Sequence, residues 1–308
     1  MREDDVIAEL LAAASAEAGP HLVRGPGDDA ALLRPPPGHE LVWSVDDHVE
    51  GVHFRPAWGW EAAGRKAAGA ALSDLAASGA APLGALLSLG LPRDVDPADL
   101  RALARGFGAK LRQAVCPLAG GNVTRSAGVR LSTSVLGAVP RGGGLWRDGA
   151  RPGAELFVSG PLGLARAGLV WLEGGGALDE AALAPALDAL LDPSPRLALG
   201  LRLGASEGVA ALDLSDGLAR DLPRLAAACG CAAQVDLGRV PGPPADVAAR
   251  VAVDPIELAW EGGEDYELLV AGPAELEALG LVRIGRLIEG TPGAVEGGGA
   301  PGGYDPFA

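Results

Sequence analysis

The chain has 308 residues, of which 48% are hydrophobic and 21% charged, and its formal net charge is −15. At roughly 150 residues per domain, this length allows two domains with hydrophobic cores, and the composition is typical of a globular protein. The acidic balance excludes a typical nucleic-acid-binding protein, which carries a basic stripe, and the presence of only two lysines excludes a mechanism that needs several.

Helices and strands alternate irregularly through the first half of the chain. Apolar residues at helical spacing between Val6 and Leu11 predict a first helix. Gly79 is expected to end the second helix, and residues 119–122 are expected to form a glycine turn. The predicted helices are 4–16, 60–78 and 97–115, and the predicted strands are 28–33, 41–46, 83–89 and 129–139.

One segment could be mistaken for a membrane span, because Asp74 is the only charged residue between Lys66 and Arg93. Its apolar residues are mostly alanine and glycine, and an aspartate near the bilayer centre would cost about 2.5–3.5 kcal/mol. Gly79 and Pro82 also interrupt it. We therefore predict a buried helix-turn-strand unit and no membrane association.

Five of the six residues 140–145 are Pro, Arg or Gly, and this run is the predicted domain boundary. It divides the chain into an N-terminal domain, 1–140, and a C-terminal domain, 141–308. Because neither half alternates strand and helix regularly, the predicted fold class is α+β with two mixed domains. In the second half we expect strands at 155–159, 209–213, 232–236 and 266–270, and a surface tail at 290–308.

Carboxylates gather in five short clusters beside glycines or other small residues. Neighbouring acids repel one another, and a fold tolerates them most easily around bound cations. Ligands that offer only oxygen favour Mg²⁺ or Ca²⁺, and Mg²⁺ usually accompanies phosphate. The pattern therefore predicts a metal-dependent phosphate enzyme. The clusters are 27–30, 44–47, 72–75, 213–217 and 262–265.

The acids differ in what they can do. Consecutive side chains of an extended segment point to opposite faces, so only one member each of Asp28–Asp29 and Asp46–Asp47 is expected to be a ligand. Asp213 and Asp216 straddle a strand-to-helix junction, where both can face an ion or a phosphate. Asp74 lies in an apolar helix and has to be exposed, paired or metal-bound. A lone Asp-Asp pair is more often a solvated turn, so the prediction depends on the five clusters together.

Other residues leave more than one interpretation open. Lys66 lies two turns before Asp74 and either pairs with it, reaches a substrate or is an ordinary surface lysine. His53 on its own is more often structural than catalytic. Gly120 and Gly121 could present backbone N–H groups to a phosphate or form a plain turn.

Known phosphate motifs are missing. Residues 25–30 match G-x-G-x-x-A, but two carboxylates inside the loop would repel a pyrophosphate. Residues 59–66 nearly fit a Walker A loop, but Arg65 occupies its lysine position and the Ser or Thr that would hold Mg²⁺ is missing. Any nucleotide has to be bound in another way.

The three cysteines, Cys116, Cys229 and Cys231, are odd in number and poorly spaced for disulfides, which favours a reducing compartment. Cys229 and Cys231 also lack the second pair that a metal site would need. The acidic residues 1–5 lack the charge pattern of a signal peptide. We expect a cytoplasmic protein.

Taken in order, the clusters resemble the thiamine-monophosphate kinase family, of the superfamily that includes aminoimidazole ribonucleotide synthetase. The resemblance covers nearly the whole chain, and the combination is specific although each piece is weak. The matching stretches are 25–31, 44–46 with 51–54, 72–76 with 79–80, 120–121 with 124–125, 213–218, 262–268 and 303–305.

The resemblance implies transfer of the γ-phosphoryl group of ATP to thiamine monophosphate, which gives thiamine diphosphate and ADP. It also implies a homodimer in which the N-terminal sheets of two copies join, and a C-terminal domain that closes over the nucleotide. The substrate phosphate is already an anionic nucleophile, so we assign no general base.

The resemblance further implies roles for individual residues. Those that would surround several Mg²⁺ ions are Asp29, Ser44, Val45 through its backbone, Asp46, Asp74, Asn122, Asp213 and Asp216. Those that would bind ATP are Gly121, Asn122, Arg147 and Ser215, and those that would bind the substrate are His53 and Glu264.

The chain departs from the family at two places. Asn122 stands where the family has Asp, so one Mg²⁺ is expected to bind more weakly or be lost. Pro301–Gly302 stands where an aromatic residue usually precedes the tail, so stacking on thiamine has to come from elsewhere. The alternatives are another ATP-dependent superfamily member such as aminoimidazole ribonucleotide synthetase, and a catalytically inactive scaffold that binds metal or nucleotide.

Overall fold

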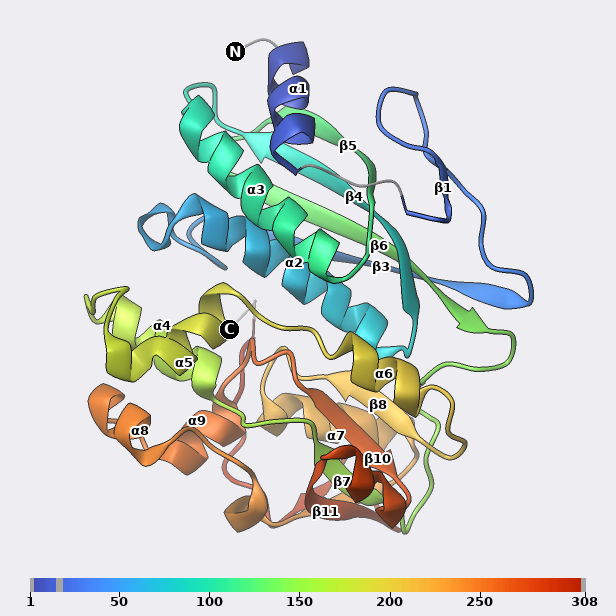
Figure 1. Cartoon of the computed structure of the whole chain (residues 1–308). Coiled ribbons are helices and arrows are strands. Elements are labelled where there is room, and N and C mark those ends of the chain that lie inside the picture. Colours follow the sequence, from blue (N-terminus) through green and yellow to red (C-terminus); the bar gives the residue numbers. More distant parts are fainter. Residues whose placement is uncertain (1–2, 15–18, 306–308) are drawn as a thin grey trace. The chain divides into compact units, whose positions relative to one another are not determined.

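The computed structural model describes residues 3–14 and 19–305, which form two compact units (Figure 1). Unit 1 comprises residues 1–75 and 80–143, and unit 2 comprises residues 76–79 and 144–308. Each unit combines a β-sheet with helices, which confirms the predicted α+β class. The division of the chain into two domains after residue 140 stays a prediction.

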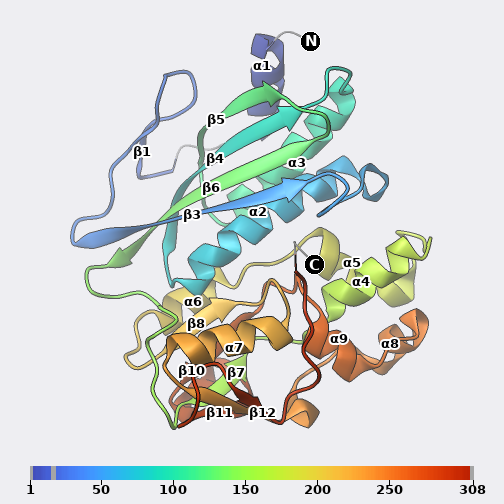
Figure 2. The same cartoon turned by 180° about the vertical axis from the view of Figure 1, so that it is seen from behind.

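Unit 1 is a four-stranded sheet with two long helices, α2 and α3, on one of its faces (Figures 1 and 2). The strand order is β3-β6-β4-β5, with β6 antiparallel to both neighbours and β5 parallel to β4. The elements are α1 (Glu3–Ala14), β1 (Leu22–Arg24), β2 (Leu32–Leu33), β3 (His39–Val49), the 3-10 helix η1 (Pro56–Trp58), α2 (Trp60–Ala77), β4 (Ala81–Leu91), α3 (Pro97–Gln113), β5 (Leu118–Arg125) and β6 (Arg130–Pro140).

Small residues let α2 and α3 pack closely. A Cβ at Gly64 or Gly106 would overlap the backbone of the opposite helix, so both positions require glycine. Asp96 caps α3 by accepting a hydrogen bond from the Ala98 amide at 2.7 Å, and Pro97 occupies the first turn. α2 ends before Gly79, which has the left-handed φ of +65° that glycine adopts easily.

Strand β3 has two different faces, because its side chains alternate. One face lies toward α2 and carries Ser44, Asp46 and the buried His48. The other face, which we call the open face, is the one on which no described helix of unit 1 lies (Figure 2). It carries three large apolar side chains with high exposure: Leu41 (54%), Trp43 (73%) and Val45 (66%).

Unit 2 is a six-stranded sheet with an apolar cluster on each face, in the order β12-β9-β11-β7-β10-β8. Leu222 and Leu225 of α7 pack on one face, and Leu203 and Leu276 pack on the other. The elements are β7 (Glu155–Val158), α4 (Leu164–Glu173), η2 (Ala181–Leu183), α5 (Ala184–Leu191), α6 (Leu197–Leu203), β8 (Ala210–Asp213), α7 (Leu218–Ala228), β9 (Ala232–Val235), η3 (Leu237–Arg239), α8 (Ala245–Val251), α9 (Pro255–Glu261), β10 (Leu268–Gly272), η4 (Ala274–Leu279), β11 (Val282–Ile288) and β12 (Val295–Glu296).

The C-terminal tail lies against unit 2, as predicted for the described part of 290–308. Trp260 donates its indole N–H to the Ala300 carbonyl at 2.8 Å. The Tyr304 amide donates to the Asp216 carbonyl at 2.9 Å, and Arg220 forms an ion pair with Asp305 at 3.3 Å. The tail is therefore bound to the segment that links β8 and α7.

Several predicted elements are confirmed, and others are wrong. α2 and β4 confirm the helix-turn-strand interpretation of the long apolar segment. Only Leu32–Leu33 of the predicted strand 28–33 is a strand, so Asp28 and Asp29 lie in the turn before it. Asp46 and Asp47 lie inside β3 rather than at its end, because the strand continues to Val49.

The predicted glycine turn at 119–122 is also wrong, because these residues lie inside β5. A Cβ at Gly121 would overlap the Leu87 carbonyl, so glycine serves close approach of β5 to β4 here. The end of the first predicted helix, residues 15 and 16, lies outside the described residues. Within the described ranges, none of the helices combines the length and hydropathy needed to span a bilayer.

Candidate functional site

Ser44, Asp46 and Asp74 lie together where β3 faces α2. The Ser44 hydroxyl donates a hydrogen bond to the Asp74 carboxylate at 2.5 Å, so the strand and helix residues are adjacent. Asp46 lies two residues further on the same face of β3, with its side chain partly exposed. All three side chains offer oxygen, the ligand that Mg²⁺ prefers. The structure thus brings together three of the residues expected to surround metal.

Two buried basic residues lie beside this group. His48 and Lys66 are each 1% exposed, so the surface-lysine interpretation of Lys66 is wrong. The His48 Nδ1 atom is 3.8 Å from an oxygen of Asp46. Burial, the Lys66 cation and His53 together hold the pKa of His48 well below its ordinary value, so its ring is neutral.

His53 lies in the turn that follows β3, beside His48. Their ring centroids are 5.1 Å apart. The His53 Nδ1 atom accepts a hydrogen bond from the Val49 amide at 3.1 Å, which places the proton of a neutral ring on Nε2. His53 is therefore fixed in one orientation close to the acidic group.

Asp47 lies on the open face, opposite to Asp46, as strand alternation predicts. Its carboxylate accepts hydrogen bonds from Ser132 and, at 2.5 Å, from Arg130 of the neighbouring strand β6. Burial alone would raise the pKa of Asp47, but these two partners hold it below its ordinary value. The Asp47 carboxylate is thus already hydrogen-bonded within the sheet, whereas Asp46 faces α2.

Asp28 and Asp29 also differ in whether their carboxylates are already bonded within the chain. Asp28 forms an ion pair with Arg24 at 2.8 Å, and its other oxygen accepts the Asp29 amide at 2.9 Å. Asp29 is exposed. Of this pair, Asp29 is the member that could serve as a ligand. Val45, for which only a backbone role is expected, points its side chain to the open face.

Asn122 lies far from Asp46 within one chain. Asp47, Ser132, Ser88 and Asn122 occupy matching positions on four successive strands. The Asn122 amide group reaches the Ser88 hydroxyl at 3.5 Å, which puts it on the open face. With neighbouring strands roughly 4.8 Å apart, Asn122 is about 14 Å from β3. The structure does not bring Gly121 and Asn122 beside Asp46 and Asp74 of the same chain.

In unit 2, Asp213, Ser215 and Asp216 lie at the predicted junction between β8 and α7. Asp216 is hydrogen-bonded through its backbone and its side chain. Its amide donates to the Asp221 carboxylate at 3.0 Å, and its own carboxylate accepts from Arg224 at 2.6 Å. Arg224 also binds Asp221 at 2.8 Å. Burial raises the pKa of Asp221 to about 6, and Arg224 works against this rise.

Glu264 lies in the loop between α9 and β10, which runs beside this junction. Its amide donates to the Ser215 carbonyl at 2.8 Å, so Glu264 and Ser215 are neighbours. Further along, Glu267 is buried and accepts hydrogen bonds from Ser159 and from two nitrogens of Arg196. The structure thus groups Ser215, Asp216 and Glu264, while Arg147 lies in an exposed loop before β7.

Sequence reasoning missed four residues that support these loops: Asp221, Arg224, Asp265 and Glu267. Asp221 and Arg224 carried a weak signal, because they lie three residues apart just after the predicted strand-to-helix junction. Asp265 and Glu267 lie in the acidic stretch 262–268 that the sequence singled out, but nothing signalled a supporting role, because their partners lie 102 and 71 residues away.

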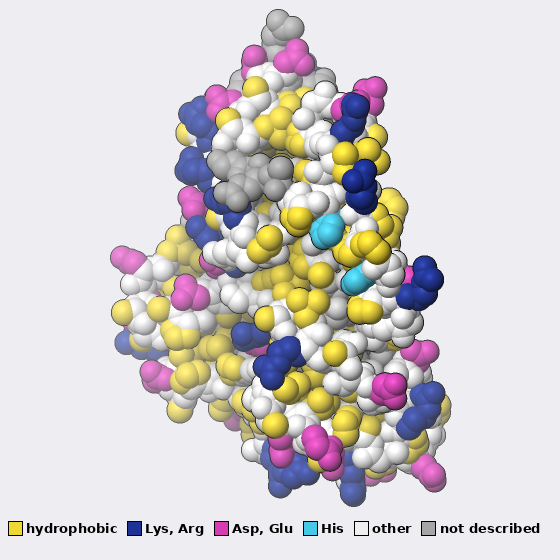
Figure 3. All heavy atoms as spheres, turned by 45° about the vertical axis from the view of Figure 1, so that its right-hand side comes forward, with side chains coloured by type: hydrophobic (Ala, Val, Ile, Leu, Met, Phe, Trp, Pro, Cys, Tyr) yellow, Lys and Arg dark blue, Asp and Glu magenta, His cyan; other side chains and the backbone are white. Residues whose placement is uncertain are grey.

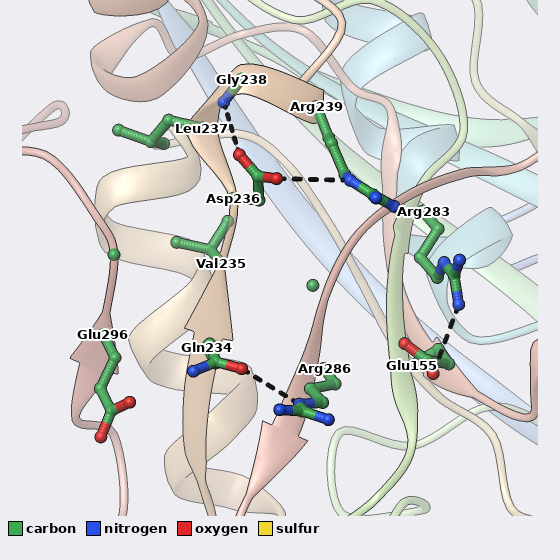
Figure 4. A pocket seen from close by; sticks show the side chains of 12 residues that line it. Glu155, Gln234, Val235, Asp236, Leu237, Gly238, Arg239, Arg283, Arg286 and Glu296 are labelled. Atoms are coloured by element: carbon green, nitrogen blue, oxygen red, sulfur yellow. Dashed lines mark hydrogen bonds and ion pairs between the residues drawn. The ribbon is translucent and has the colours of Figure 1, made fainter.

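The hollow drawn in Figure 4, about 890 Å³, contains none of the predicted residues. Each of its three arginines already has an acceptor in the hollow, at 3.1 to 3.5 Å. We therefore assign no site there. The pairs are Arg239 with Asp236, Arg283 with Glu155, and Arg286 with Gln234.

Two further observations concern charge. Within residues 3–14 and 19–305, no group of three His, Cys, Asp or Glu side chains is arranged to hold a metal ion by itself. On the described part of the face drawn in Figure 3, Lys and Arg side chains lie scattered among acidic and hydrophobic ones.

Comparison with known proteins identifies clear relatives. Residues 27–139 match the family model of the AIR synthase related protein, N-terminal domain. The thiamine-monophosphate kinase of Synechococcus elongatus is 38% identical over 266 residues, 82% of this chain and 80% of its own. The crystal structure of thiamine-monophosphate kinase from Stenotrophomonas maltophilia is 36% identical, with a TM-score of 0.81 over 96% of each chain. The structure of AaThiL complexed with AMPPCP and TMP is 30% identical, with a TM-score of 0.82 over 100% of this chain and 99% of its own.

Proposed function

This chain belongs to the thiamine-monophosphate kinase family, and on that premise we propose that it phosphorylates thiamine monophosphate with ATP, giving thiamine diphosphate and ADP. The observation that carries the proposal is the match of nearly the whole chain, in sequence and in fold, to kinases of this name. Binding of an ATP analogue and TMP by AaThiL supports the same pair of substrates here. Neither alternative from the sequence, a synthetase or an inactive scaffold, is favoured.

We propose that Ser44, Asp46 and Asp74 of unit 1, with Asp29 and the Val45 backbone, hold Mg²⁺. The donors fit this ion, since all are oxygens and Ser44 already touches Asp74. Mg²⁺ usually takes only one or two carboxylates and completes its shell with water and substrate phosphates, so no three-acid cage is needed. Bound there, Mg²⁺ would neutralise charge on the transferred phosphoryl group.

In unit 2 we propose that Asp213 and Asp216 are further metal ligands, that Ser215 and Arg147 contact ATP and that Glu264 contacts thiamine monophosphate. The close packing of Ser215 against Glu264 supports this assignment, because the two substrates have to meet. His53 of unit 1 is proposed as a second substrate contact, held by Val49.

No residue is proposed as a general base. The phosphate of thiamine monophosphate is ionised at neutral pH and can attack the γ-phosphorus directly. The chain's own residues therefore align the two phosphates and balance their charge. His48 is buried, so its ring has no direct access to bulk solvent.

The direct test is a kinase assay with purified protein, Mg²⁺, ATP and thiamine monophosphate. We expect equal amounts of thiamine diphosphate and ADP, separated and measured by liquid chromatography. Omitting thiamine monophosphate should leave ATP intact. Tight ATP binding without any product would instead support an inactive scaffold.

We also propose that the chain forms a homodimer through the open face of unit 1. The exposed stripe of Leu41, Trp43 and Val45 supports this, because large apolar side chains at high exposure mark an interface. Gly121 and Asn122 belong to the same sheet but lie far from Asp46 of their own chain. Asn122 lies on the open face, so it would belong to the proposed interface.

Replacing Trp43 with Glu should convert the dimer to a monomer, because it buries a charge in the proposed interface. Sedimentation velocity would measure this. Trp146→Glu, at a residue 50% exposed in unit 2, is the matched control and should leave the mass unchanged. A wild-type chain that sediments as a monomer would refute the dimer.

A reducing compartment such as the cytoplasm is proposed as its location. The three cysteines, Cys116, Cys229 and Cys231, are free and buried, which supports this.

A further inference from the structure

We propose that Asp265 is a positioning residue: it holds Glu264 in place by anchoring the loop 262–267 to the N-terminus of α4. This inference rests on the proposed function, in which Glu264 contacts thiamine monophosphate. Asp265 itself is not proposed to touch either substrate.

The backbone of this loop is strained on both sides of Asp265. Glu264 has a φ of +64° and Tyr266 a φ of +51°, both in the left-handed region that non-glycine residues rarely adopt. Such a conformation persists only when its surroundings enforce it, and it is common at binding sites. The contacts that enforce it therefore decide where the Glu264 side chain lies.

One set of contacts comes from the end of β8. The Glu264 amide donates to the Ser215 carbonyl at 2.8 Å, and the Tyr266 amide donates to the Leu214 carbonyl at 2.9 Å. The Leu214 amide in turn donates to the Glu267 carbonyl at 2.8 Å. These bonds hold the loop along the edge that faces the end of β8.

Asp265 supplies the other set. Its carboxylate accepts hydrogen bonds from the Gly163 amide at 2.7 Å and from the Ala165 amide at 3.4 Å. Gly163 is the N-cap residue of α4 and has no side chain with which to cap the helix. Asp265 therefore replaces that cap from a position 102 residues away.

The α4 terminus is a firm anchor. Gly163 has a φ of +81°, and a Cβ there would overlap the Leu258 backbone of α9, so neither the residue nor its conformation can change freely. The Leu258 carbonyl also accepts the amide of Gly262, the first residue of the loop, at 3.0 Å. Asp265 thus connects Glu264 to a part of unit 2 that cannot shift by itself.

Glu267 does not duplicate this role. Its carboxylate binds Arg196 and Ser159, which fixes the far end of the loop where β10 begins. Without Asp265, the loop would lose the two bonds that tie it to α4, while the Glu264 and Tyr266 amides would keep their bonds to Ser215 and Leu214. The strained conformation at Glu264 would then relax.

The test compares Asp265→Ala with Asp265→Asn in steady-state kinetics. In Asp265→Ala, KM for thiamine monophosphate should rise about tenfold, with kcat and KM for ATP changed by less than about threefold, since only one substrate contact is displaced. Asp265→Asn keeps an acceptor oxygen for the two amides and should restore values close to the wild type. Asp96→Ala is the control, because it removes a helix cap in unit 1 and should alter neither KM.

Hydrogen exchange provides a second measurement that needs no activity. The amides of Glu264 and Tyr266 should exchange about tenfold faster in Asp265→Ala, as local opening becomes easier, and at the wild-type rate in Asp265→Asn. If Asp265→Ala fails to fold, Asp265→Glu displaces the carboxylate while keeping its chemistry, and should raise KM for thiamine monophosphate only.

Unchanged KM and unchanged exchange in Asp265→Ala would overturn the inference, and so would equal losses in the Ala and Asn variants. A wild-type protein without kinase activity would overturn the proposed function instead. In that case the exchange experiment still decides whether Asp265 anchors the loop.

Discussion

The two units present their candidate residues in different ways. In unit 1, Ser44 and Asp46 lie on a regular strand and Asp74 on a regular helix. In unit 2, Ser215, Asp216 and Glu264 lie on loops, whose shape depends on two strained residues and on buried acids. The first arrangement needs only strand alternation and helix packing, whereas the second needs specific bonds between distant parts of the chain.

This difference predicts two kinds of mutant. Removing a candidate residue of unit 1 should remove function and leave the fold, because the backbone there is regular without it. Removing a supporting residue of unit 2 should weaken the fold and the site together. Three experiments test the comparison.

The largest effect is expected for Asp74→Asn. The amide still accepts the Ser44 hydrogen bond, so the melting temperature should stay within about 3 °C, while loss of the negative charge should lower kcat by about 100- to 1,000-fold. Glu61→Gln, on the same helix and paired with Arg65, is the control and should keep full activity. A near-normal rate in Asp74→Asn would show that Asp74 is not a required ligand.

A smaller effect, on stability, is expected for Arg196→Met. It leaves the buried Glu267 carboxylate without its cation, which should lower the free energy of unfolding by about 2 kcal/mol, measured by urea denaturation. Arg283→Met is matched to it, because Arg283 is similarly exposed but pairs with the less buried Glu155 and Glu277. The Arg283→Met substitution should lower the free energy of unfolding by less than about 1 kcal/mol. Equal losses would contradict the special role of buried acids in unit 2.

The smallest effect, taken per pH unit, is a pH dependence of stability from Asp265. Burial raises its pKa to about 8, against the Gly163 and Ala165 amides and with help from the charges of Glu267 and Glu264. Because this pKa exceeds the value of 3.8 expected in the unfolded chain, the folded state keeps the proton up to a higher pH. The contribution of Asp265 to the free energy of unfolding is therefore fully present below about pH 4 and is lost as the pH rises to about 8.

Unfolding free energies measured from pH 5 to 7.5 test this directly. The wild type should lose up to about 1.4 kcal/mol per pH unit relative to Asp265→Asn, which cannot titrate. Parallel curves for the two proteins would show that Asp265 is ionised throughout and that its bonds to α4 are those of a carboxylate.

Much of unit 1 was predictable because local rules determine it. Apolar spacing and Gly79 located α2, and strand alternation correctly placed Asp46 and Asp47 on opposite faces. The glycine pair at Gly120–Gly121 was misread, since glycine favours both a turn and a close strand contact, and only the partner strand decides between them.

The supports of unit 2 were not predictable for a different reason. Asp265 and Glu267 sit in an acidic stretch that reads as a ligand cluster, but they bind Gly163 and Arg196 from other elements. No periodicity in the chain signals a contact across 102 or 71 residues. The junction of Asp213 and Asp216, by contrast, followed from a strand and a helix that adjoin in sequence.

The attachment of the C-terminal tail has a practical consequence for handling this protein. Tyr304 and Asp305 are bonded to Asp216 and Arg220, so the end of the chain is mechanically coupled to a loop that carries a candidate ligand. An affinity tag fused at that end is expected to disturb measured activity, even without unfolding anything.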